Sequence, residues 1–307
     1  MPRPCLAPTL LSCLLLVLPA WAHATSEEEP EEESPPQEVY RPVTSGPFVT
    51  FTAPITPRGG LVTQPIFSFV GARGDYDGEG RYQPLLRGES LHATALSLFV
   101  EYGLLERLAA GAQVTLQHNR HRSGPEEAAS TGLGDTSLFA RGTLLHETPG
   151  GVPEVALLAQ VKLPTGRAES AEAHLLDTDV LGTGSTDLTL GLDLTLGLRP
   201  VLLHVDVLYT HALPARVGGE SISHGPTFSW SLSGEYPFWP DRLGLMLEVS
   251  GRHQEEDGAA DEVLVGAGLE VLFSAELQLL VGYQRTVWGR NARALDALVI
   301  TLVPTFL

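Results

Sequence analysis

The sequence predicts an all-β fold, a transmembrane antiparallel up-and-down β-barrel of about twelve strands, on three observations. Apolar and polar residues alternate, the alternating segments are long, and short connections alternate with longer ones. The alternation is clearest in Thr186–Thr210, TDLTLGLDLTLGLRPVLLHVDVLYT, where every second residue from Leu188 to Leu198 is leucine. Because successive side chains of a strand point to opposite faces, this segment forms a hairpin with one wholly apolar face. A helix would spread the same leucines around its whole circumference.

Strand length separates this barrel from a soluble sandwich. Each arm of the hairpin spans about eleven residues, which matches the roughly 9–11 that a tilted strand needs to cross a bilayer. A soluble β-sandwich also alternates, but it needs neither this length nor charges in the middle of so many strands. The expected strands are Leu61–Gly71, Glu89–Glu101, Arg107–His118, Gly134–His146, Glu154–Leu163, Ser185–Gly197, Val201–His211, Gly225–Tyr236, Arg242–Arg252, Glu262–Leu272, Glu276–Thr286 and Ala294–Phe306.

The connections also fit a membrane barrel. Short periplasmic turns that alternate with longer external loops are typical of outer-membrane barrels. The expected tight turns are Tyr102–Glu106, Glu147–Pro153, Leu198–Pro200, Pro237–Asp241 and Phe273–Ala275. The expected external loops are Ala72–Gly88, Asn119–Leu133, Pro164–Gly184, Ala212–His224, His253–Asp261 and Val287–Arg293.

The first part of the chain has a different composition. Residues 1–24 resemble a secretory signal peptide, with a basic Arg3, the apolar core Leu10–Leu18 and a small-x-small cleavage site that ends at Ala24. The predicted domains are a signal peptide at 1–24, an acidic, proline-rich disordered lead-in at 25–47, and an outer-membrane β-barrel at 48–307. We therefore expect an exported protein whose signal peptide is removed and which resides in the outer membrane of a Gram-negative cell.

Composition and motifs exclude several kinds of chemistry. The net charge of −18 argues against binding to nucleic acid, which requires a basic patch. Both cysteines, Cys5 and Cys13, lie in the predicted signal peptide, so no disulfide or cysteine metal site is expected. His204 and Asp206 lie on one strand face, as a base and its orienting acid would, but the sequence places no serine beside them. We expect no enzyme activity, no cofactor and no metal.

The polar face of the strands is predicted to line the lumen. A barrel of about twelve strands is wider than a filled eight-stranded one and narrower than an open porin, so long polar side chains can narrow or plug it. Arg141 and Lys162 can neutralise acidic neighbours such as Asp193, Asp206, Glu154 or Glu248. The predicted pore-lining residues are Gln113, Arg141, Gln160, Lys162, Asp193, His204, Asp206, Glu248, Glu270 and Gln278.

Four phrases of the sequence carry a resemblance to a known family. They are PLLRGESL (84–91), GLGDTSLFARGTLLHE (132–147), PEVALLAQVKLPTGR (153–167) and LGTGSTDLTLGLDLTL (181–196). They are similar to the outer-membrane barrel family named for meta-pathway phenol degradation, over roughly Phe48 to the C-terminus. The resemblance implies passage of small molecules, apolar or aromatic ones among them. Asp135, Lys162 and Asp187 match positions of the family's pattern, and a structural role at strand ends also accounts for them.

Two functions fit these observations. The leading one is a passive outer-membrane channel or transporter for small solutes, and the alternative is a closed barrel with a structural or surface-interaction role and no transport. The expected partners are outer-membrane lipid and lipopolysaccharide, the barrel-assembly machinery and a small-molecule solute, with no nucleic acid.

Overall fold

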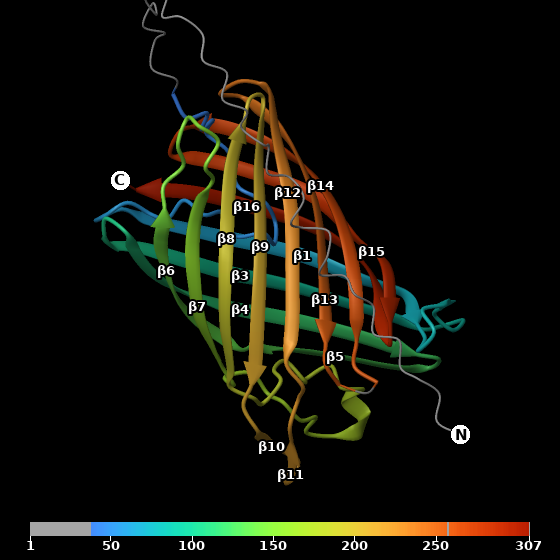
Figure 1. Ribbon diagram of the computed structural model, residues 1–307. Coiled ribbons are helices and arrows are strands. Elements are labelled where there is room, and N and C mark those ends of the chain that lie inside the picture. The colour runs from blue at the N-terminus through green and yellow to red at the C-terminus, as the bar shows by residue number, and fades with distance from the viewer. Residues whose placement is uncertain (1–37, 257, 307) are drawn as a thin grey trace, which may run out of the picture. The chain divides into compact units, whose positions relative to one another are not determined.

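Twelve long strands form a closed antiparallel barrel in the computed structural model, which describes residues 38–256 and 258–306 (Figure 1). The predicted signal peptide and residues 25–37 of the predicted lead-in lie outside the described residues. The long strands are β1 (Leu61–Tyr76), β3 (Ser90–Leu105), β4 (Leu108–Ser123), β6 (Thr136–Leu145), β7 (Glu154–Leu163), β8 (Asp187–Leu198), β9 (Val201–Ala212), β12 (Thr227–Trp239), β13 (Leu243–Gln254), β14 (Asp261–Ser274), β15 (Leu277–Arg290) and β16 (Ala292–Phe306). The shorter elements are β2 (Tyr82–Pro84), β5 (Glu126–Leu133), the 3₁₀ helix η1 (Ala173–Leu175), β10 (Ala215–Val217) and β11 (Glu220–Ile222).

The strand order confirms the predicted up-and-down topology. Each long strand pairs with its neighbours along the chain, and β1 also pairs with β16, which closes the sheet on itself. Both β5 and β6 pair with β4, so they act as one strand that is interrupted at Gly134–Asp135. No helix among the described residues is long and apolar enough to cross a membrane.

The two faces of the strands differ as the alternation predicts. On β8, Leu188, Leu190 and Leu192 are 46%, 60% and 44% exposed, whereas Thr189 and Asp193 on the opposite face are 7% and 0% exposed. Leucine side chains on the outside of a closed barrel are suited to hydrocarbon, and the polar side chains are then enclosed.

Exposed aromatic side chains mark both ends of the β12 strand. Tyr236, Phe238 and Trp239 lie at one end, and Phe228 lies at the other, paired with Tyr209 of β9. Aromatic residues are enriched where a barrel meets the two membrane–water interfaces. Their separation along one strand is consistent with a strand that crosses the bilayer.

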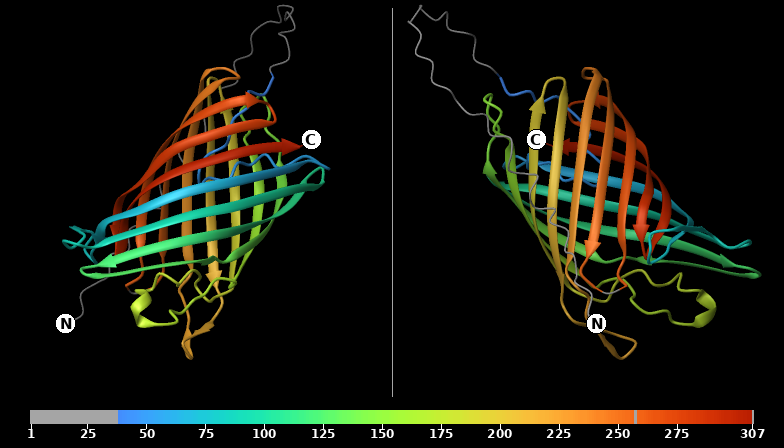
Figure 2. Two further views of the ribbon diagram at one scale, coloured as in Figure 1. Left: turned by 180° about the vertical axis from the view of Figure 1, so that it is seen from behind. Right: turned by 45° about the vertical axis from the view of Figure 1, so that its right-hand side comes forward.

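The connections differ between the two ends of the barrel, as the sequence predicts. The tight-turn end joins strands through short connections such as Arg199–Pro200 and Ala275–Glu276. The opposite end, which we call the loop end, carries the connection 164–186 and the β10–β11 hairpin (Figure 2).

Two predicted external loops are wrong. The residues 119–133 form a hairpin of β4 with β5, and the residues 287–293 are strand except for Asn291. The reason lies in cross-strand ion pairs. In the first segment Arg120 and Arg122 both bind Glu127 from the paired strand, and in the second Arg290 pairs with Asp261 of β14 and Arg293 with Asp75 of β1. Opposite charges across a ladder stabilise strands beyond the membrane, where a polar sequence alone is easily mistaken for a loop.

Candidate functional site in the lumen

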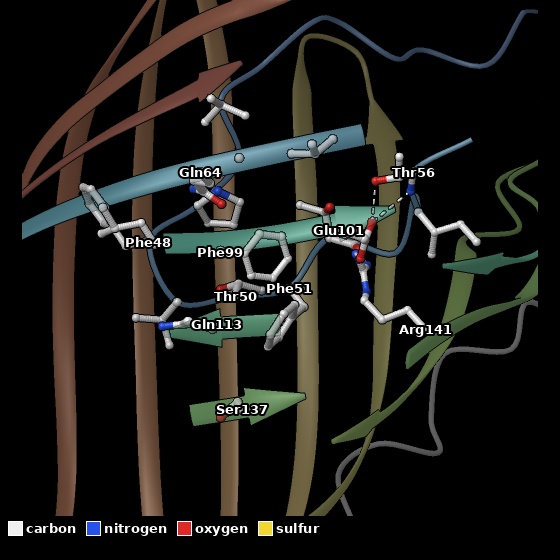
Figure 3. A pocket seen from close by; sticks show the side chains of 18 of the residues that line it. Phe48, Thr50, Phe51, Thr56, Gln64, Phe99, Glu101, Gln113, Ser137 and Arg141 are labelled. Carbon is white, nitrogen blue, oxygen red and sulfur yellow. Dashed lines mark hydrogen bonds and ion pairs between the residues drawn. The ribbon is translucent and has the colours of Figure 1, made fainter. Parts of the chain in front are cut away.

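We call the described residues before β1, Glu38–Gly60, the inner segment, because residues 45–52 and 54–57 line a cavity inside the barrel (Figure 3). The segment enters at the tight-turn end, where Arg41 forms ion pairs with Glu147 (3.3 Å) and with Glu154. It passes Phe48 and returns to the tight-turn end, where β1 begins. Its last residues pair with β3, where Arg58 forms a bridge with Gly103 and the Gly59 amide donates to the Gly103 carbonyl (2.8 Å). The backbone before them does not join the barrel's ladder, so its N–H groups need other acceptors.

Inward-pointing side chains of the barrel strands supply these acceptors. The Glu248 carboxylate accepts hydrogen bonds from the Thr50 amide (2.7 Å) and hydroxyl (2.5 Å), and Asp206 accepts one from the Phe51 amide (2.9 Å). Hydrogen bonds to an ionised group are stronger than neutral ones. Two more acceptors act in the same way: Thr195 Oγ1 for the Ala53 amide (2.9 Å), and Glu101 for the Thr56 amide (2.9 Å) and hydroxyl (2.6 Å).

A notch of glycines holds the ring of Phe48. Gly268 of β14 and Gly282 of β15 are paired in register. A Cβ atom added to Gly268 would lie 2.8 Å from Phe48 Cζ, and one added to Gly282 would overlap that atom. Glycine is therefore required at these positions as long as the ring is in place. The notch fixes the depth of the inner segment in the lumen.

Arg141 of β6 joins the inner segment to both sides of the lumen. Its guanidinium pairs with Glu101 (3.0 Å) and Asp193 (3.4 Å) and donates to the Thr52 carbonyl. It also lies 5.6 Å from the centroid of the Phe51 ring. Arg141 is 4% exposed, so a charge with a planar fork of donors is held here by several acceptors at once.

His204 has partners other than the one its sequence position suggests. Its Nδ1 lies 2.8 Å from Thr195 Oγ1, and its Nε2 lies 3.2 Å from a Glu235 oxygen. Asp206 instead accepts the Phe51 amide, so the predicted pairing of base and orienting acid is not formed. Since the Thr195 hydroxyl also accepts the Ala53 amide, these side chains are occupied in holding the inner segment.

The lumen has two unlike sides. The acidic wall consists of β8, β9, β12, β13 and β14, each of which carries one inward carboxylate that is at most 5% exposed. The amide wall consists of β1, β3, β4, β6 and β7, whose inner faces present Gln64, Phe99, Gln113 and Ser137 (Figure 3), together with Gln160. Its two buried carboxylates, Glu101 and Glu154, lie near the tight-turn end and bind Thr56 and Arg41 of the inner segment. The carboxylates of the acidic wall are Asp193, Asp206, Glu235, Glu248 and Glu270.

A cavity of about 630 Å³ lies between the inner segment and the amide wall. Phe48, Phe51 and Phe99 contribute aromatic surface, and the amides of Gln64 and Gln113 contribute donors and acceptors (Figure 3). Ligand sites in proteins commonly have this size and this mixture of apolar surface and a few polar groups.

The ten predicted pore-lining residues lie in four places. Gln113, Arg141 and Gln160 line the cavity. Asp193, His204, Asp206, Glu248 and Glu270 lie on the acidic wall, and Gln278 is 3% exposed near the tight-turn end. Lys162 lies toward the loop end, where it pairs with Asp187 (2.6 Å) and Asp135 (3.5 Å) rather than with the acids of the lumen. That these ten residues line the path of a permeating solute stays a prediction.

The three family-pattern residues meet at one place. Lys162 bridges Asp135 and Asp187, and Asp135 also accepts the amides of Gly166 (3.0 Å) and Thr183 (2.9 Å). The phrases that contain them therefore form the base of the connection 164–186.

A second anchor holds the same connection farther out. Asp179 accepts the Ala171 amide (2.9 Å) and pairs with Arg167 (3.1 Å). The amide hydrogen bond from Ala171 lowers the pKa of Asp179 below its usual value. Both anchors hold the connection in place, and the first borders the cavity through Asp135.

Sequence reasoning did not identify the inner segment as part of the site. Ser45, Phe48, Thr50 and Phe51 all line the cavity, yet their segment is short, rich in proline and glycine, and without alternation. The only available signal was the surplus of mid-strand acids, which exceeds what Arg141 and Lys162 can neutralise. Among the described residues, no group of three histidine or acidic side chains is placed to hold a metal.

Comparisons with known proteins agree with the fold. An outer membrane channel from Pseudomonas putida F1 is 17% identical with a TM-score of 0.64, covering 81% of this chain and 96% of that one. The β domain of the Bordetella autotransporter BrkA (10% identity, TM-score 0.47, 81% of this chain, 100% of that one) and the NanC porin (10%, 0.46, 80%, 100%) are more distantly similar. No curated protein matched the chain by sequence. The model of the family described as "Putative MetA-pathway of phenol degradation" matches residues 85–302, more than half of the chain, and the chain belongs to that family.

Proposed function

We propose that this protein is a passive channel of the outer membrane that admits small solutes through its lumen. The observation that carries the proposal is the cavity of about 630 Å³ between the inner segment and the amide wall, inside a barrel with a leucine-rich outer surface. The solved barrel from P. putida F1 with the same fold is described as an outer membrane channel. The protein's localisation in the outer membrane is part of the same proposal.

The lining of the cavity favours small solutes with apolar or aromatic parts. Three phenylalanine rings face it, and Phe99 is stacked on Phe139 with a centroid distance of 4.9 Å. Such rings bind flat apolar groups, and the glutamine amides can bind a hydroxyl or carbonyl group of the same solute. The family's description refers to phenol degradation, which is consistent with solutes of this class.

The inner segment must move before the lumen can open more widely than the cavity beside it. It fills the lumen beside the cavity, and side chains of the barrel accept hydrogen bonds from five of its amides, those of residues 49, 50, 51, 53 and 56. We therefore expect a small basal conductance and a larger one when the segment is displaced.

Planar-bilayer conductance of the purified mature protein tests the proposal. The wild type is compared with Gly268→Val, which fills the notch of Phe48, and with Gly234→Val on the outer face, where an added Cβ would lie 3.4 Å from Leu203 Cδ2. We expect larger conductance in Gly268→Val only. Absence of current in all three folded proteins, together with no swelling of liposomes in small sugars or alcohols, would refute a channel.

The attachments of the inner segment also favour a second candidate, the closed barrel. Buried hydrogen bonds that hold one arrangement rigid are what a structural barrel requires. In that case the protein would act through its external surface, and the β4–β5 hairpin would be the prominent feature there. Loss of a surface phenotype on shortening this hairpin, with no conductance in any variant, would support this candidate instead.

A further inference from the structure

We propose that the acidic wall is a recognition surface for small organic cations, and that the inner segment occupies it by imitating their N–H donors. The inference rests on the proposed channel function and specifies the solutes: those that bear an ammonium group pass in preference to anions once the segment has moved aside.

The acidic wall has an unusual charge density for buried side chains. Five neighbouring strands each place one carboxylate inside, and Asp193 and Asp206 are directly opposite each other in the β8–β9 ladder. Like charges in that position destabilise a strand pair unless something positive lies between or beside them. Arg141 is the guanidinium beside Asp193, and His204 is the only imidazole of the wall in the described residues.

The inner segment satisfies only part of this wall. Its amides bind Asp206 and Glu248, as described above. Both carboxylate oxygens of Glu270 are buried and have no hydrogen-bond partner among the described residues, and Glu235 has only His204 Nε2 beside it, at 3.2 Å. Buried carboxylates without sufficient partners are costly, so Glu270 and the second oxygen of Glu235 provide unmet acceptors beside the ones that the segment fills.

An ammonium group suits this wall better than the segment's amides do. It carries a full positive charge and up to three N–H donors, and charge-assisted hydrogen bonds are about twice as strong as neutral ones. The hydroxyls of Ser231 and Ser233, which are also buried and without partners in the described part of the chain, lie on β12 within the same wall. An anion would meet the same carboxylates with repulsion and would have only Arg141, already paired, to bind.

The apolar part of such a solute has a place on the other side of the lumen. Phe51, whose ring lies 5.6 Å from the Arg141 guanidinium of β6, and Phe99 of β3 lie toward the amide wall, whereas Phe48 closes the cavity from the glycine notch of β14 and β15. An ammonium group at the acidic wall and an apolar or aromatic body toward the amide wall would therefore use both sides of the lumen.

The test measures reversal potentials across planar bilayers that contain the Gly268→Val protein, first in a KCl gradient and then in an ethanolammonium chloride gradient. A unit charge about 4 Å from an ion alters its population by about fivefold even in water. We expect a cation-to-chloride permeability ratio of at least about fivefold. In the same background, Asp206→Asn with Glu248→Gln should bring the ratio toward one.

A matched control removes the charge of one glutamate and one aspartate outside the lumen. Glu127 and Asp296 pair with exposed arginines, Arg122 and Arg285 respectively, so Glu127→Gln with Asp296→Asn should leave the ratio unchanged. Phe48→Ala replaces Gly268→Val if the latter does not fold, as judged by heat-modifiable migration in gels. Measurable current with a ratio near or below one would overturn this inference and leave the channel intact, whereas absence of current in every folded variant would refute the channel and this inference with it.

Discussion

The acidic wall and the amide wall of the same lumen differ in what lies against their polar side chains. The acidic wall is covered, because its carboxylates accept amide hydrogen bonds from the inner segment. The amide wall is covered only near the tight-turn end, where Glu101 and Glu154 bind Thr56 and Arg41, and the cavity of about 630 Å³ lies against the rest of it. A buried carboxylate needs a donor or a cation, whereas an uncharged amide tolerates a space that water or a solute can fill. The difference explains why the segment lies where it does and why the cavity lies opposite.

The largest expected effect follows from removing the residue that joins the two walls. Arg141→Ala leaves Glu101 and Asp193 buried without their cation, and breaking a buried ion pair in this way costs about 3–5 kcal/mol. We expect the barrel to unfold in urea at a clearly lower midpoint, measured by heat-modifiable migration. Arg141→Lys keeps the charge but loses the planar fork, so its midpoint should fall between those of Arg141→Ala and the wild type. An unchanged midpoint for Arg141→Ala would show that the two walls are not coupled through this residue.

The next effect concerns the segment's attachment to the acidic wall alone. Thr50→Val removes the hydroxyl donor to Glu248 but keeps the Thr50 amide, and a hydrogen bond to a charged group contributes about 1.5–3 kcal/mol. Since about 1.4 kcal/mol is a tenfold change in an equilibrium, openings to the large conductance should become at least about tenfold more frequent. Thr52→Val is the control, because the Thr52 side-chain hydroxyl makes no hydrogen bond to the described residues and the backbone carbonyl that binds Arg141 remains. Equal opening frequencies in the two variants would contradict the role of Glu248.

A substitution on the amide wall should change the rate at which solutes pass but not the movement of the inner segment. Ser137 lies on β6 and lines the cavity, so Ser137→Trp fills part of it without touching any acceptor of the inner segment. We expect slower swelling of liposomes in small solutes, with the opening frequency of the wild type. A change in the opening frequency, with swelling unaltered, would mean that the amide wall holds the inner segment and does not control the passage of solutes.

The sequence predicted one part of this comparison well and missed the other. Alternation requires only the chain's own neighbours, so the leucines of β8 and the inward Asp193 and Asp206 were assigned to their faces correctly. What covers Asp206 and the neighbouring Glu248 is a contact with Phe51 and Thr50, respectively, residues about 150 to 200 positions away. No periodicity encodes such a contact, because the inner segment is held by isolated hydrogen bonds and one ring in a glycine notch. The far part of β4 was missed for a related reason, since its polar residues form strand only through ion pairs to β5.

The smallest expected effect lies outside both walls, in the connection 164–186. The Ala171 amide holds the pKa of the Asp179 carboxyl below its usual value of 3.8. A carboxyl with a lowered pKa in the folded state contributes stability that is complete above the unfolded value and is lost as pH falls through the folded one. Protection of the connection's amides against hydrogen exchange, relative to their intrinsic rates at each pH, should therefore fall in the wild type only at acidic pH. It should already be lower at neutral pH in Asp179→Asn, whose side chain carries no charge. Conductance and opening frequency should not change in this variant, since Asp179 contacts neither the acidic wall nor the inner segment. If the opening frequency rose together with hydrogen exchange of the connection 164–186, then this connection would also control the position of the inner segment, and the two walls alone would not account for opening.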